Sequence, residues 1–202
     1  MILMGVYRSP FVRRVAISLH LLGIEFEHRA LSPARDVDEL RRLNPLGRVP
    51  ALLLDDGEVL VDSAAILDHL DQVAGVQRAL VPSDPAERRR VLQLVALLAG
   101  VGEKSVAGFY ERTRRPAELI HAPWAEHLDS QVAAGLAAVD ARAREPFLAG
   151  DRLTQADVTA VAVLDFVRSI EPNLAPPGRY HRLDALYERC YRLPAFAETR
   201  PA

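Results

Sequence analysis

The chain has 202 residues, half of them hydrophobic, which is enough for one large domain or two small ones with a sizeable core. Its 25 lysines and arginines nearly balance its 27 aspartates and glutamates, so no overall basic field supports binding to nucleic acid. A single cysteine, Cys190, excludes an intramolecular disulfide and a cysteine-rich metal site.

The first 31 residues follow a strand–helix–strand pattern. Met1 to Tyr7 is a short apolar run typical of a buried strand, and Phe26 to Leu31 alternates like a second strand. Between them, Phe11 to Leu22 has helical periodicity, and Gly23 is placed to end the helix. The unit has the length that a parallel crossover needs.

Ser9-Pro10 stands where the first strand gives way to the first helix. Serine is a strong N-cap residue, and proline suits the first helical position because its missing N–H costs nothing there. The Ser9 hydroxyl would then lie among unpaired backbone N–H groups at the positive end of a helix, where an anion is readily held. From these residues alone, a serine that only caps the helix is the commoner case.

From residue 36 to residue 74 the sequence predicts a helix, a hairpin and another helix. Asp36 to Leu43 predicts a short helix, Pro50 opens an apolar strand, and Asp55-Asp56-Gly57 predicts a hairpin turn. Ser63 is the expected N-cap of a helix over Ala64 to Ala74. The order β-α-β-α-β-β-α predicts an α/β domain over residues 1–76.

After Gly75 the pattern changes to helices alone. We expect a linker over residues 77–86 and an all-helical domain over 87–202, with long helices over Glu87 to Arg112 and Pro123 to Arg144. A last amphipathic helix is expected over Leu183 to Tyr191.

Thr154 and Asp157 have the spacing of a capping box, with Leu153 and Val158 placed as a hydrophobic staple. The helix that follows is apolar almost all round, so it should form the buried centre of the second domain. Asp157 is therefore interpreted as a structural cap.

Neither a signal peptide nor a metal site is expected. The apolar start is only six residues long and is followed by no cleavage motif. The run Val91 to Gly102 is too short to span a bilayer, and the six histidines lack ligand spacing. We therefore expect a cytoplasmic protein with no metal and no membrane partner.

Four motifs together give a resemblance that covers the whole chain. They are Tyr7-Arg8-Ser9-Pro10-Phe11-Val12-Arg13-Arg14-Val15, Asn44-Pro45-Leu46-Gly47-Arg48-Val49-Pro50, Val61-Asp62-Ser63-Ala64-Ala65-Ile66-Leu67, and Phe147-Leu148-Ala149-Gly150-Asp151 with Thr154-Gln155-Ala156-Asp157. In this order and spacing the chain resembles the cytosolic glutathione S-transferase family. The Ser-Pro-Phe form is similar to serine-type bacterial members and, around Ser9, to the plant tau class. The resemblance implies a thioredoxin-like domain followed by an all-helical bundle.

The resemblance implies that a hydroxyl at Ser9 donates a hydrogen bond to the sulfur of bound glutathione and favours its thiolate, the nucleophilic form. Tyr7 is the alternative, because several classes of the family use a tyrosine near the end of the first strand. Cysteine-type members carry a cysteine in this loop, and none is present here.

The resemblance also implies a glutathione-binding set, which comprises Arg48, Val49, Pro50, Asp62 and Ser63. Val49 would pair its backbone with the cysteinyl unit, Pro50 would be cis, and Arg48 would meet the glycyl carboxylate. Asp62 would meet the ammonium of the γ-glutamyl end and Ser63 its carboxylate. Asp62 is one methylene shorter than the glutamate that is commoner in the family, so we expect its contact with the ammonium to be weaker or differently directed.

The function implied is attack of glutathione thiolate on a small hydrophobic electrophile by a homodimeric transferase. Candidate residues for the wall of the electrophile site are Phe11, Val12, Phe109 and Tyr110, each equally explicable as core. Two alternatives stay open. One is a non-catalytic binding or scaffold protein, like the bacterial stringent-starvation proteins and elongation-factor gamma subunits. The other is a glutathione-dependent isomerase, dehalogenase or peroxidase.

Overall fold

The computed structural model describes residues 1–201, which divide into two compact units. The first unit contains Met1–Ser83 together with the residues from Tyr191 onward, and the second contains Asp84–Cys190. This division differs from the one expected from the sequence, because the C-terminal segment belongs to the first unit.

The first unit is built on a four-stranded mixed sheet with strand order β2-β1-β3-β4. Strands β1 (Ile2–Met4) and β2 (Glu27–Arg29) are parallel, and β1 is antiparallel to β3 (Ala51–Leu53). Strand β4 (Val59–Val61) closes the hairpin with β3. The predicted β-α-β-α-β-β-α order is confirmed, although each strand has only three residues.

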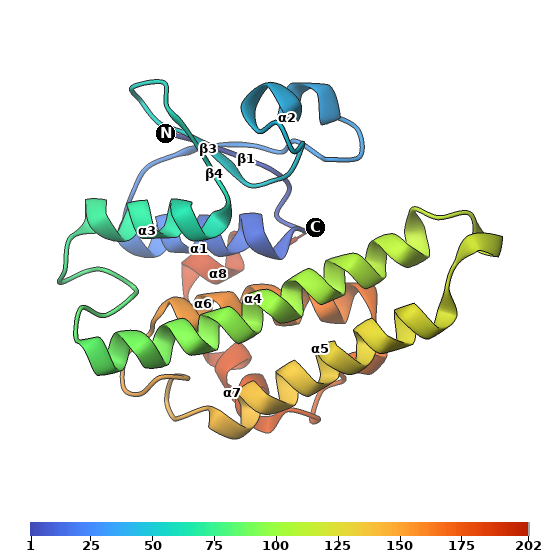
Figure 1. The fold of residues 1–202 in the computed structure, drawn as a ribbon. Helices are drawn as coiled ribbons and strands as arrows, with labels where there is room; N and C mark the ends of the chain where they lie inside the picture. Colours follow the sequence, from blue (N-terminus) through green and yellow to red (C-terminus); the bar gives the residue numbers. More distant parts are fainter. Residues whose placement is uncertain (202) are drawn as a thin grey trace. The chain divides into compact units, whose positions relative to one another are not determined.

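Helices α1 (Pro10–Leu22) and α3 (Ser63–Ala74) pack against each other on one face of this sheet (Figure 1). The short helix α2 (Val37–Leu43) lies beyond the sheet from them. Gly23 ends α1 as predicted: its φ of 65° is left-handed, a conformation that glycine adopts without a steric penalty. The core of this unit is formed mainly by aliphatic side chains from the sheet and the two long helices, together with Leu40 of α2 and Phe196 of the C-terminal segment.

Arg13 joins the C-terminal segment to α1. Its guanidinium is buried and donates to the backbone oxygens of Thr199 and Phe196, at 3.0 and 3.2 Å, and to the Tyr191 hydroxyl at 2.7 Å. The short helix α8 (Pro194–Ala197) packs against α1. These charge-assisted bonds explain why a segment from the far end of the chain completes the first unit.

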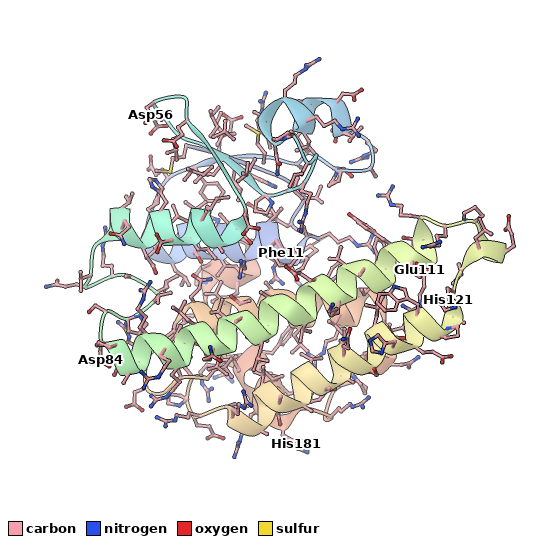
Figure 2. All side chains as sticks on the ribbon, in the orientation of Figure 1. Phe11, Asp56, Asp84, Glu111, His121 and His181 are labelled. Atoms are coloured by element: carbon pink, nitrogen blue, oxygen red, sulfur yellow. The ribbon has the colours of Figure 1, made fainter. Side chains whose placement is uncertain are left out.

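The second unit is helical throughout its described residues. Its α-helices are α4 (Pro85–Thr113), α5 (Ala122–Arg142), α6 (Gln155–Ile170) and α7 (His181–Cys190), with single 3₁₀ turns η1 (Ala117–Leu119) and η2 (Pro172–Leu174). Asp84 and His121 cap α4 and α5 (Figure 2). The bounds of α4 and α5 differ from the predicted helices by one or two residues at each end.

Helix α4 is long and apolar enough to cross a membrane by length and composition, with a mean hydropathy of 1.4 over its best window. A core helix of a soluble bundle passes the same test. The buried side chains of α4, including Val91, Leu94, Leu98 and Val101, recur at helical spacing, and the helix packs against α5 and α6. This packing accounts for the apolar stripe.

The capping box at the start of α6 is confirmed. One carboxylate oxygen of Asp157 accepts from the Thr154 N–H at 2.7 Å and from its hydroxyl at 2.9 Å. The other accepts from the Leu148 N–H at 2.7 Å. Burial raises the pKa of Asp157, and these donors oppose the rise. The helix it begins is buried on nearly all sides, as predicted.

Replacing Asp157 with alanine should lower the free energy of unfolding by about 2–4 kcal/mol, since the buried N–H groups of Leu148 and Thr154 and the Thr154 hydroxyl lose their acceptor. Urea denaturation followed by circular dichroism measures this. Asp151→Ala, at an exposed position six residues upstream, is the control, with an expected change below about 0.5 kcal/mol. Equal effects of the two substitutions would contradict the capping role.

Candidate functional site

Ser9 caps α1, and its hydroxyl is only loosely engaged. Its backbone is extended, Pro10 occupies the first helical position, and the Val12 N–H reaches the Ser9 Oγ at 3.5 Å, a long hydrogen bond. The described residues show no bond donated by this hydroxyl. Ser9 therefore places a half-buried hydroxyl with an unused hydrogen at the positive end of a helix.

Tyr7 is engaged elsewhere. Its ring stacks on the His28 imidazole, with centroids 3.9 Å apart and planes 6° from parallel. The Nε2 atom of His28 lies 2.7 Å from the Gly5 carbonyl oxygen, so Nε2 carries the hydrogen. Burial raises the pKa of the Tyr7 hydroxyl, which favours the neutral phenol. The geometry thus describes Tyr7 as one half of a stacked pair beside the Ser9 loop.

The peptide bond between Val49 and Pro50 is cis, as expected. Val49 lies just before β3. Among the described residues, its backbone makes no hydrogen bond to another backbone group outside the helices and strands. The Asn44 side chain bridges the loop before it, accepting from the Leu46 N–H at 3.0 Å and donating to the Arg48 carbonyl at 3.1 Å. The Arg48 side chain itself is exposed.

Asp62, not Ser63, is the N-cap of α3, which corrects the sequence interpretation. Its carboxylate accepts from the Ala64 N–H at 2.8 Å. Asp62 has a φ of 68°, the one positive value among the described non-glycine residues. Such a conformation costs energy for a residue with a Cβ, and strained residues of this kind cluster at active sites and ligand-binding sites. The shift moves Ser63 into the first turn of the helix.

Ser63 is almost completely buried, and its oxygen accepts two hydrogen bonds from Arg14 on α1. The Nε and Nη2 atoms of Arg14 lie 3.1 and 2.6 Å from the Ser63 Oγ. Sequence reasoning did not single out Arg14. The available signal was a charged residue inside an apolar helix, on the same face as Ile17 and Ser18.

Three segments of the first unit meet: the end of β1, the loop before the cis-proline, and the start of α1. A Cβ built on Gly5 would lie 3.0 Å from the Val49 side chain and 2.5 Å from Val12, so the end of β1, the cis-proline loop and α1 are in contact. Arg14 connects α1 with the start of α3. Together these segments carry a hydroxyl, a free backbone edge and a helix N-terminus, which suits an extended peptide-like anion.

The candidate wall residues behave differently within their own units. Val12 is fully buried in the first unit. Phe11, at the start of α1 (Figure 2), is half-buried, and the Arg14 guanidinium lies over its ring. In the second unit Phe109 packs edge-on against Phe166, and Tyr110 is 41% exposed. An electrophile contact for Phe11, Phe109 or Tyr110 stays a prediction, and Val12 offers such a ligand no surface.

Residues 1–201 contain no group of three or more histidine, cysteine, aspartate or glutamate side chains that could hold a metal ion. The single cysteine, Cys190, is fully buried at the end of α7. Burial, with a smaller contribution from the Asp157 charge, raises the pKa of its thiol to about 12.

Comparison with known proteins agrees with this geometry. The model of the glutathione S-transferase N-terminal domain matches residues 3–79, and that of the C-terminal domain matches residues 115–194. A maleylacetoacetate isomerase of Pseudomonas aeruginosa is 33% identical, covering 97% of this chain and 93% of its own. The probable maleylacetoacetate isomerase 1 of Drosophila melanogaster is 28% identical, covering 100% of this chain and 81% of its own.

Solved structures extend the similarity to the whole fold. A glutathione S-transferase from Methylobacterium radiotolerans, in complex with glutathione sulfonate, has a TM-score of 0.93 at 29% identity and covers 99% of this chain and 94% of its own. A glutathione transferase family member from Pseudomonas fluorescens, with bound glutathione, has a TM-score of 0.88 at 32% identity, with 100% and 98% covered.

Cys190 should be unreactive in the native protein. At pH 8 a thiol with a pKa of about 12 is thiolate in roughly one molecule in ten thousand, and the side chain is also shielded from solvent. A chromogenic disulfide reagent should therefore release no colour until urea unfolds the chain, and then one equivalent of thiol. Rapid native reaction would contradict a packing role for this residue.

Proposed function

Because the chain belongs to the glutathione S-transferase family, we propose that it is an enzyme that binds glutathione on its first unit and uses the thiolate as a nucleophile. Ser9 would donate its unused hydroxyl hydrogen to the glutathione sulfur. The N-terminus of α1 adds a positive partial charge at the same place. Both effects stabilise the thiolate relative to the thiol and so lower the pKa of the bound thiol.

The remaining groups of the site fit the rest of the tripeptide. The backbone of Val49 would pair with the cysteinyl unit, as an added strand pairs with a sheet edge. Asp62 would meet the ammonium of the γ-glutamyl end and Ser63 its carboxylate, with Arg48 at the glycyl carboxylate. The observation that carries the proposal is that Ser9 and Ser63 each hold a hydroxyl hydrogen to which the described chain offers no acceptor.

The chemical step begins when the thiolate sulfur adds to an electrophilic carbon and a C–S bond forms. In conjugation a leaving group departs with its electron pair, or a proton is taken up, and the thioether is released. In isomerisation of a cis double bond conjugated to a carbonyl, addition of the sulfur turns the C=C bond into a C–C single bond, and the adduct rotates about that C–C bond. The same C–S bond then breaks, so the thiolate returns and nothing is oxidised or reduced.

The names of the curated relatives favour isomerisation as the natural reaction. Several that align over nearly the whole chain are maleylacetoacetate or maleylpyruvate isomerases, at 25–33% identity. We therefore propose a cis-unsaturated maleyl-type acid as the substrate class, with conjugation of other electrophiles as a further reaction of the same thiolate. A homodimer is proposed on the same family basis.

Calorimetric titration should detect glutathione binding in the micromolar to low millimolar range. Ser9→Ala should lower kcat/KM roughly 10- to 100-fold and raise the pKa of the bound thiol, because a charge-assisted hydrogen bond to sulfur is lost. The thiolate absorbance in the ultraviolet, followed against pH, measures that pKa. Tyr7→Phe is the matched control and should leave the thiol pKa nearly unchanged.

Two outcomes would overturn these assignments. If no heat is detected with millimolar glutathione, the enzyme proposal fails and a non-catalytic scaffold is favoured. If Tyr7→Phe alone abolishes thiolate formation, then Tyr7 and not Ser9 stabilises the sulfur.

The proposed reaction class is tested by incubating the protein with maleylacetoacetate or maleylpyruvate and catalytic amounts of glutathione. The expected result is complete conversion to the trans isomer with no consumption of glutathione. An aryl chloride electrophile is the comparison, and its conversion should consume one glutathione per product. Two results would favour conjugation instead. One is consumption of one glutathione for each maleyl acid converted; the other is rapid turnover of the aryl chloride with no turnover of the maleyl acid.

A further inference from the structure

Arg14 and Ser63 form a buried polar contact in the interior of the first unit. Each residue is only 3% exposed, and the two come from different helices, 49 positions apart in the sequence. The guanidinium presents two adjacent N–H groups to a single oxygen, through Nε at 3.1 Å and Nη2 at 2.6 Å. A buried charged group is costly to desolvate, so the hydrogen bonds that it makes in the interior matter for its burial.

The geometry decides which way the serine hydroxyl acts. A hydroxyl oxygen has two lone pairs and one hydrogen. Two guanidinium N–H groups occupy the lone pairs of Ser63, so this oxygen has no room left to accept from a ligand. Its hydrogen finds no acceptor among residues 1–201. Ser63 can therefore act toward a ligand only as a donor.

We propose that Arg14 is a positioning residue that fixes Ser63 as a hydrogen-bond donor and so makes the start of α3 selective for a carboxylate. This inference rests on the proposed function, in which the carboxylate is the one on the γ-glutamyl end of glutathione. Without Arg14 the hydroxyl is free to rotate, and it accepts from an ammonium or from water as readily as it donates to a carboxylate.

The arrangement holds Arg14 firmly in this role. The guanidinium carbon lies 5.7 Å from the centroid of the Phe11 ring, within the range of a cation–π contact. Its charge lies behind the Ser63 oxygen, where it adds to the positive end of α3. Lysine has a compact ammonium in place of the planar fork, so it reproduces the charge but not the paired N–H geometry.

The test measures carboxylate preference rather than activity. Two ligands are titrated by calorimetry: glutathione, and an analogue in which hydrogen replaces the α-carboxylate of the γ-glutamyl unit. Wild-type protein should prefer glutathione by roughly 10- to 100-fold, the usual effect of a charge-assisted hydrogen bond. Ser63→Ala and Arg14→Met should both reduce the preference to a few-fold, and Arg14→Lys should retain part of it.

Arg13→Met is the matched control, because Arg13 is an equally buried arginine on the same helix that contacts the C-terminal segment and not Ser63. It should lower the melting temperature and leave the ratio of the two affinities at the wild-type value. Thermal melts of all variants separate loss of folding from loss of preference. If Arg14→Met does not fold, the ratio for Arg14→Lys decides.

A preference ratio in the folded Arg14 variants that equals the wild-type ratio overturns the positioning role, while glutathione binding by wild type still supports the proposed function. The same ratio change in Arg13→Met also overturns it, since a general loosening of α1 would then be the cause. If wild type binds neither ligand, both the proposed function and this inference fail.

Discussion

The site depends on one constraint of helix geometry, namely that the first backbone N–H groups of a helix have no partner within it. Two helices of the first unit, α1 and α3, begin with such groups, and short polar side chains meet them there: Ser9 at α1 and Asp62 at α3. Each start satisfies itself only in part. Two hydroxyl groups keep hydrogen-bonding capacity: the Ser9 hydroxyl is weakly engaged, and the Ser63 hydroxyl has an undonated hydrogen. A peptide with a thiol and a carboxylate needs such donors.

Two neighbouring arginines of α1, Arg13 and Arg14, hold α1 in place through different contacts. Arg13 reaches the C-terminal segment and joins the far end of the chain to α1, while Arg14 reaches Ser63 and joins α1 to α3. Both guanidinium groups are buried, where hydrogen bonds to charge are strong and losing a partner is costly. In the first unit, the buried hydrogen bonds of these two arginines thus stabilise the helices whose N-termini form the candidate site.

The local features of the fold could be predicted because their chemistry lies within a few residues. Ser9-Pro10 as a helix start, Gly23 as a helix end, and Thr154 with Asp157 as a capping box all follow from propensity and spacing. The N-cap of α3 is an exception: aspartate and serine are about equally good caps, so composition does not decide between Asp62 and Ser63, and the structure begins the helix one residue earlier than expected, with Asp62 at a positive φ.

The long-range features could not be predicted, because no pattern within a segment encodes its partner. Arg14 and Arg13 meet groups 49 and 186 positions away, so their burial and their roles follow only from the packed structure. The identity of the ligand could not be predicted from the residues alone. Glutathione was expected only because the chain resembles the glutathione S-transferase family.

The account is tested most directly by a crystal structure of the chain with bound glutathione. It predicts the glutathione sulfur within about 3.5 Å of the Ser9 Oγ, and the γ-glutamyl carboxylate accepting a hydrogen bond from Ser63 while Arg14 keeps both of its bonds to that oxygen. A sulfur held instead by the Tyr7 hydroxyl, or a tripeptide bound away from the starts of α1 and α3, would contradict it.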